Sequence, residues 1–170
     1  ANILANRDPA RMAFQKNIDQ LKVFVRNRNL PIHLQHRIRD YYAYLWKKRL
    51  GYDESSFLDR LPSGLKNDVE LYLKRQIVDK IPLFKETGED FLNAIALNLK
   101  PAIYTPGDLI VRQGDDGHEM FLIVKGNVKV YKNESPESEL VLNEGSFVGE
   151  IALLQNVPRN ANVQANTYVD

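Results

Sequence analysis

The sequence contains no cysteine and no long apolar run, and both absences narrow what the chain can be. Without cysteine the fold has no disulfide framework and no thiolate ligand for a metal. The longest uninterrupted apolar and aromatic run lies between Tyr41 and Trp46, far short of the roughly 20 residues that cross a bilayer as a helix. We expect any connection to a membrane to lie outside these 170 residues.

Histidine is also scarce, which argues against a metal enzyme. His118 stands beside Glu119, but barrel enzymes that bind metal in this way use a His-x-His pair, and the second half of the chain has no other histidine. His33 and His36 lie where a helix is expected to begin, and solvent exposure explains them. Since no Ser, His and Asp grouping is evident either, we expect no catalytic residue and no metal site.

The net charge of +1 conceals two halves of opposite sign. Residues 1–80 carry sixteen Lys and Arg against nine Asp and Glu, whereas residues 81–170 carry seven against thirteen. The cations of the first half alternate with carboxylates and apolar residues instead of clustering. That arrangement favours a solvated face or a charge-paired protein interface, so we expect no nucleic-acid partner.

The first half has the pattern of successive helices. Asp8 suits an N-cap and Pro9 the first helical position. Apolar residues then recur at helical spacing in two segments separated by Asn29, Leu30 and Pro31. The two stripes are Phe14, Ile18, Leu21 and Val25, and then Leu34, Ile38, Tyr41 and Leu45, with Trp46 beside the second. We predict an antiparallel hairpin that leaves its second stripe open to a neighbour, followed by helices over about 53–61 and 63–80.

Turn residues divide the second half into short β-rich runs at intervals of about 8 to 12 residues. The runs cover 109–112, 120–124, 128–131, 140–142 and 161–168. The run over 120–124 is continuously apolar and is expected to be a central strand. The predicted fold class is α+β: a helical domain over 1–80, and a second domain over 81–170 in which a helix over 87–100 precedes a β-roll of jelly-roll type over 102–170.

The segment from Gly145 to Ala161 concentrates groups that suit an anionic ligand. Gly149 lets the backbone approach an anion, and the apolar run after it can form a helical turn with N–H groups facing a phosphate. Glu150 can accept a hydrogen bond from a ribose hydroxyl. Arg159 offers a planar fork of donors that matches two phosphate oxygens.

This segment resembles the phosphate-binding cassette of cyclic-nucleotide-binding domains, with its Phe, Gly-Glu, a small residue and Leu, followed by Pro-Arg-x-Ala. The resemblance implies a site for cyclic AMP or cyclic GMP. Its residues would be Phe147, Val148, Gly149, Glu150, Ile151, Ala152, Leu153, Arg159, Asn160 and Ala161, with apolar contacts from Val111 and Leu122. Asn160 stands where relatives often have a hydroxyl that bonds guanine, so we expect cyclic AMP to bind at least as tightly as cyclic GMP.

The helical half resembles the C-linker of cyclic-nucleotide-gated and hyperpolarisation-activated channels. The similar segments are Phe14-Gln15, Tyr42 to Trp46, Leu61-Pro62, and Ile81 to Phe84 with a helix capped by Thr87. The resemblance implies the gating module of a homotetrameric cation channel at the cytoplasmic face of the cell membrane, with other subunits as partners and no enzyme activity.

Two alternatives use the same roll. A transcription regulator needs a helix-turn-helix after it, and a kinase regulatory subunit needs a second cassette. In relatives a lid helix closes over the base, and we expect the end at Asp170 to be a truncation before that helix.

Overall fold

The computed structural model describes residues 9–49, 57–155 and 157–170. The chain divides into two compact units, Ala1–Ser63 and Gly64–Asp170. The helix that begins at residue 63 therefore groups with the roll, although the sequence places the domain boundary at residue 80. That sequence boundary stays a prediction.

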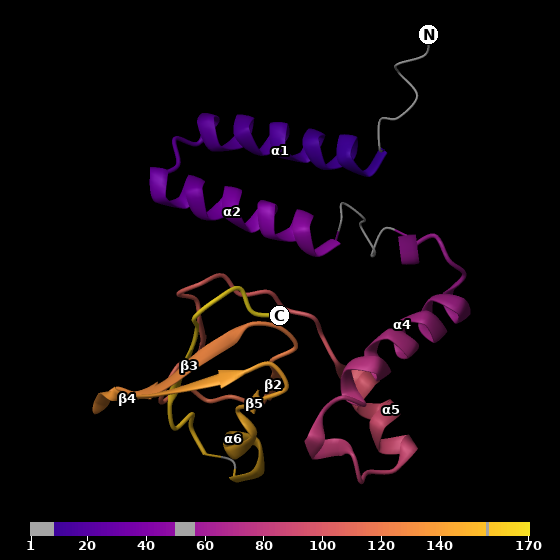
Figure 1. Cartoon of the computed structure of the whole chain (residues 1–170), viewed down its shortest axis with the longest axis vertical. Coiled ribbons are helices and arrows are strands. Elements are labelled where there is room, and N and C mark those ends of the chain that lie inside the picture. Colours follow the sequence, from indigo (N-terminus) through magenta and orange to yellow (C-terminus); the bar gives the residue numbers. More distant parts are fainter. Residues whose placement is uncertain (1–8, 50–56, 156) are drawn as a thin grey trace. The chain divides into compact units, whose positions relative to one another are not determined.

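The first unit contains a helical hairpin of α1 (Pro9–Asn27) and α2 (Ile32–Arg49), seen side by side in Figure 1. Asn29 closes the turn between them with a positive φ of 49°. The rings of Phe14 and Trp46 lie 4.6 Å apart, so the start of α1 meets the end of α2 and the pair is antiparallel. The expected N-cap, Asp8, lies outside the described residues.

Both predicted stripes are half-buried, as expected for the facing sides of the hairpin. The second stripe is therefore not fully open as expected, and Phe14 of α1 contacts Tyr42 and Trp46 beside it. The large apolar side chains that α1 leaves exposed are Met12, Val23 and Phe24. Any neighbour that binds α1 through apolar contacts would meet these three.

The second unit begins with α4 (Ser63–Val78), the short 3-10 helix η1 (Pro82–Phe84) and α5 (Glu89–Asn98). Part of the helix expected over 53–61 lies outside the described residues, and the helical pair Phe57 and Leu58 is followed by a turn. Thr87 does not cap α5, because its hydroxyl donates to the carbonyl oxygen of Phe84 at 2.7 Å and Gly88 takes the cap position.

The roll follows, and the α+β class is confirmed. Its strands are β1 (Leu109–Val111), β2 (Phe121–Leu122), β3 (Asn127–Lys132), β4 (Ser135–Asn143), β5 (Phe147–Val148) and β6 (Asn162–Ala165), with α6 (Glu150–Gln155) between the last two. A four-stranded antiparallel sheet has the order β1-β6-β3-β4, and β2 pairs with β5 in a second sheet. Figure 1 shows β3 and β4 as the longest strands.

The prediction that residues 120–124 form a central strand, which corresponds to β2, was wrong. The strand is only two residues long and pairs with β5 alone, so it is not central. Its neighbourhood is apolar throughout because its two faces pack against different cores. Phe121 and Ile123 join the core of the roll, whereas Met120 and Leu122 pack against the core that α4, η1 and α5 share.

Candidate ligand-binding site

A cavity of about 310 Å³ lies in the roll, between the four-stranded sheet and the segment from β5 to β6. This volume is at the lower end of the range typical of small-molecule sites. Its walls come from β1, β3, β4, β5, α6, β6 and the residues just before β6. The lining residues are Val111, Val130, Lys132, Leu140, Leu142, Val148, Gly149, Glu150, Ile151, Arg159, Asn160, Ala161 and Val163.

Most residues expected at the site line this cavity. Those that do so are Val111, Val148, Gly149, Glu150, Ile151, Arg159, Asn160 and Ala161. Two do not: Phe147 and Leu122 pair with each other across β5 and β2, and Leu122 packs on the helical core. Ala152 and Leu153 lie within α6, where the structure does not describe their side chains.

Five lining residues were not expected from the sequence: Val130, Lys132, Leu140, Leu142 and Val163. Four of them lie on β3 and β4, where alternate residues share one face of the sheet. The alternation over 128–131 was visible in the sequence and indicated a strand with one buried face. It did not indicate that this face borders the ligand cavity, because that depends on the pairing of β3 with β4 and β6.

Arg159 is the central polar residue of the cavity, and it is buried with 6% of its surface exposed. Its Nη2 donates to the carbonyl oxygen of Glu119 at 2.7 Å and its Nη1 to that of Gly149 at 3.0 Å. The closest carboxylate oxygen paired with it, on Glu119, is 3.8 Å away on a largely exposed side chain. A buried cation is unfavourable unless it is compensated, and two carbonyl dipoles do this only in part.

Two glycines make room for this guanidinium. Gly149 has a φ of +93°, and a Cβ there would lie 2.5 Å from Nη1 of Arg159 and 2.9 Å from the carbonyl oxygen of Glu119. A Cβ on Gly117 would overlap the Nε and the central carbon of the same guanidinium. The expected role of Gly149 is thus refined, because the group that approaches its backbone in this structure is Arg159.

The remaining polar side chains of the lining are the carboxylate of Glu150, the amide of Asn160 and the ammonium of Lys132. Glu150 is half-buried at the first position of α6, and its carboxylate has no hydrogen bond or ion pair to another residue that the structure describes. Asn160 is exposed at the cavity beside Arg159. An unengaged carboxylate next to a buried guanidinium provides an acceptor and a cation for one ligand that carries both hydroxyls and a negative charge.

A polar network fixes the strand ends beside the cavity. Asn162, buried with 5% exposed, accepts from the backbone amide of Gln113 at 2.9 Å and donates to Oδ1 of Asn133 at 2.7 Å. The side chain of Gln113 accepts from the backbone amide of Asn133 at 2.8 Å and donates to the carboxylate of Glu134. The turn between β3 and β4 is thereby tied to the ends of β1 and β6.

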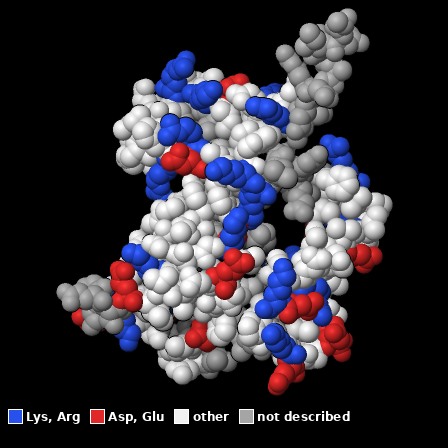
Figure 2. All heavy atoms as spheres, viewed as in Figure 1, with Lys and Arg blue, Asp and Glu red and all other residues white. Residues whose placement is uncertain are grey.

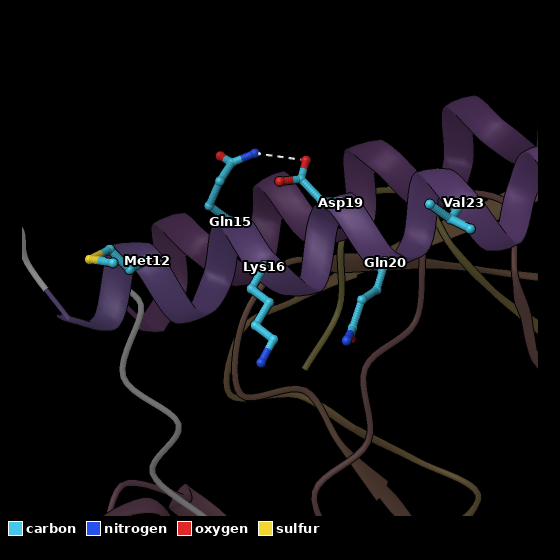
Figure 3. A pocket seen from close by; sticks show the side chains of 6 residues that line it. All are labelled: Met12, Gln15, Lys16, Asp19, Gln20 and Val23. Atoms are coloured by element: carbon cyan, nitrogen blue, oxygen red, sulfur yellow. Dashed lines mark hydrogen bonds between the residues drawn. The ribbon is translucent and has the colours of Figure 1, made fainter.

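A larger hollow of about 680 Å³ lies in the first unit, on the surface of α1 alone. Figure 3 shows its six lining side chains along this one helix, with Gln15 donating to Asp19 at 3.2 Å. The pKa of Asp19 is lowered by hydrogen bonds from Lys22 and Gln15. Since these groups are exposed and satisfy one another, the hollow lacks the buried, unpaired polar group that marks the cavity of the roll.

Other kinds of site find no support among the described residues. On the face of the hairpin that Figure 2 shows, Lys and Arg lie in several groups, with carboxylates among them. Within the described ranges no three His, Cys, Asp or Glu residues come together as metal ligands. The described helices also include none with the length and apolarity needed to cross a bilayer. His118, His33 and His36 are exposed, as expected.

An antiparallel roll whose cavity is lined by a buried guanidinium and an unengaged carboxylate has the features of a ligand-binding domain. Comparison with known proteins specifies the class. Residues 102–170 match the family described as cyclic nucleotide-binding domain, and this part of the chain belongs to that family.

The whole chain, including its helices, is similar to channel subunits. It is 31% identical over 176 residues to the cyclic nucleotide-gated channel rod photoreceptor subunit alpha of Gallus gallus, covering 99% of this chain and 27% of that protein. It is 30% identical to cyclic nucleotide-gated channel alpha-3 of Homo sapiens, covering 99% and 25%.

A third relative, the potassium/sodium hyperpolarization-activated cyclic nucleotide-gated channel 2 of Mus musculus, is 31% identical over 166 residues, covering 98% of this chain and 19% of that protein. The chain thus spans about a quarter or less of the length of the curated relatives it matches. The resemblance found in the sequence is confirmed, and these relatives are channels by name and not enzymes.

Proposed function

We propose that this chain binds a cyclic nucleotide in the cavity of its roll and is a regulatory module, not an enzyme. The observation that carries the proposal is the buried Arg159 guanidinium, which faces the cavity and, among the described residues, has no carboxylate closer than the 3.8 Å contact to Glu119. The single negative charge of a cyclic phosphate would supply the missing counter-charge.

The rest of the lining suits the other parts of such a ligand. Glu150 would accept hydrogen bonds from the ribose hydroxyls. The apolar side chains of Val130, Leu140, Leu142 and Ile151 would contact the faces of the purine. Leu140 is 58% exposed, so covering it with a base would remove apolar surface from water.

We further propose that the parent protein is a homotetrameric cation channel, and that this segment is its gating module at the cytoplasmic face of the membrane, with residues 1–80 as the C-linker. Support comes from the similarity to channel subunits, which extends over the helices as well as the roll. No observation favours the two alternatives that share the roll, a transcription regulator and a kinase regulatory subunit.

A short route for coupling leads from the cavity to the helices of the second unit. The carbonyl oxygen of Glu119 accepts from Arg159, and the next residue, Met120, packs with Leu122 against the core of α4, η1 and α5. A phosphate that draws the guanidinium away from this carbonyl would weaken the hydrogen bond that holds the chain just before β2. Binding would then favour one arrangement of the helices to the extent that its affinity differs between the two arrangements.

The first prediction tests the site by calorimetric titration of this chain with cyclic AMP, cyclic GMP and non-cyclic AMP. Arg159→Ala should weaken binding of both cyclic nucleotides by about 2 to 5 kcal/mol, the cost of removing one partner of a desolvated charge pair. The matched control is Arg112→Ala, which removes the same charge from an exposed residue outside the cavity. A parent chain that binds no cyclic nucleotide, or an Arg159→Ala variant within threefold of the parent, would refute the proposed site.

A further inference from the structure

We propose that Lys132 is a specificity residue of this cavity and favours a purine with an oxygen at position 6 over one with an amino group there. The inference rests on the proposed function, because it requires a cyclic nucleotide in the cavity. Apart from Arg159, Lys132 is the only cation among the lining residues that the structure describes.

The strand places Lys132 on the cavity side. Val128, Val130 and Lys132 are alternate residues of β3, and alternate residues share one face of a sheet. Val128 is fully buried in the core of the roll, Val130 packs against that core, and both Val130 and Lys132 line the cavity. Lys129, between Val128 and Val130, is on the opposite face, where its ammonium pairs with Glu139 at 3.3 Å.

The turn that follows fixes the backbone of Lys132. The amide of Asn133 donates to Gln113, and Gln113 donates to the two carboxylate oxygens of Glu134 at 3.1 and 3.2 Å. The pKa of Glu134 is lowered by its own backbone amide first, then by Gln113, and to a smaller extent by the charge of Lys132. Among the side chains that the structure describes, which leave out those of residues 135–138, none forms an ion pair with the Lys132 ammonium.

The chemistry at this side of the cavity sets the selectivity. The apolar residues that line the cavity together with Lys132 include Val130, Leu140, Leu142 and Ile151. An ammonium has three donors and no acceptor. Guanine presents two acceptors on one edge, O6 and N7, whereas adenine presents N7 beside an amino donor. An ammonium at the edge of the base therefore gains a second acceptor from guanine and meets a donor on adenine.

The experiment is calorimetric titration of the full chain and of Lys132→Met with cyclic GMP, cyclic IMP and cyclic AMP. The variant should bind cyclic GMP and cyclic IMP about three- to tenfold more weakly and cyclic AMP within about twofold of the parent, the modest effect expected for a solvent-accessible cation. Cyclic IMP has O6 but lacks the 2-amino group, so it separates Lys132 from any contact of Asn160 with that group. Lys132→Arg, which keeps the donors, should retain the preference of the parent.

Lys129→Met is the matched control, since it removes the same charge from the same strand on the face away from the cavity. It should leave the ratios of all three affinities unchanged. Equal weakening of all three nucleotides by Lys132→Met would show general attraction of anions and overturn the specificity role, as would no change. A parent chain that binds none of the three would instead overturn the proposed function itself.

Discussion

The Arg159 guanidinium is positioned by its surroundings as closely as by its own hydrogen bonds. Its backbone amide donates to the carbonyl oxygen of Asp115 at 2.8 Å, and its carbonyl oxygen accepts from the amide of Gly114 at 2.8 Å. The side chain then lies between the backbones of Gly117 and Gly149. Main chain holds both ends of the residue, so a small change in the loop over 114–119 would displace the cation.

The second prediction follows from this packing. Gly117→Ala places a Cβ where the guanidinium lies, and forcing a methyl group into a packed site costs about 1–3 kcal/mol. We expect the affinity for cyclic AMP and cyclic GMP to fall by about tenfold through displacement of Arg159. Titration calorimetry measures the affinity, and thermal unfolding shows whether the variant still folds.

Gly64→Ala is the control for that substitution. A Cβ on Gly64 meets no atom within 4 Å, so the change adds the same methyl group in open space. It should leave the affinity unchanged. If Gly117→Ala folded and bound both cyclic nucleotides as tightly as the parent, ligand binding would not depend on the position of the guanidinium between the two glycines.

Among the elements, the turn between β3 and β4 depends on a side chain from a distant strand. Asn162 on β6 accepts from the partly buried amide of Gln113 after β1 and bonds to Asn133 in the turn. Three segments far apart in the sequence thus meet at one buried amide side chain. The same turn carries Lys132 at the cavity, so the network stabilises the roll and positions part of the site.

The third prediction concerns this network. Asn162→Ala leaves the amide of Gln113 without its acceptor, and an unsatisfied buried donor costs about 1–3 kcal/mol. The free energy of unfolding from urea denaturation should fall by that amount. Asn166→Ala is the control, because this residue bonds to Asn127 on the exposed surface and its loss should cost less than about 0.5 kcal/mol. Equal losses for the two variants would contradict the role of Asn162.

For the whole molecule, the first unit combines an excess of cations with exposed apolar side chains on α1. Met12, Val23 and Phe24 are 52%, 56% and 52% exposed. Met12 and Val23 also line the hollow in Figure 3. The remainder of the chain has excess carboxylates. Opposite charges and an uncovered apolar surface would both favour contact between copies of the chain, in keeping with the proposed tetramer.

The fourth prediction is that the chain associates as its concentration rises, and less so at high salt, because screening weakens contacts between charged surfaces. Sedimentation velocity across a concentration series at two salt concentrations measures this. Phe24→Ser should lower the tendency to associate, whereas Asn17→Ser, an exposed polar change on the same helix, should not. A chain that remained monomeric at every concentration would leave the proposed subunit contacts without support.

The sequence by itself determined the features that depend on local spacing. The helical stripe that includes Phe14 and Ile18 predicted the buried side of α1, because helical periodicity alone fixes which residues share a face. The cassette predicted that Gly149, Glu150 and Arg159 would lie together, and all three line one cavity. Only eight or nine residues separate Glu150 and Gly149 from Arg159, so the motif could be recognised from local spacing alone.

Only the tertiary structure decided the features that depend on strand pairing and on which core a residue meets. A continuously apolar run cannot show that Leu122 packs on the core of the helices while Phe121 packs on the core of the roll, because both cores are apolar. Lys132 read as an ordinary charged residue at a strand end, and the cavity forms beside it because β3 pairs with β6 from 30 residues or more along the chain. Long-range pairing of this kind leaves no mark in the local spacing of residues, so it emerges only when the sheet has formed.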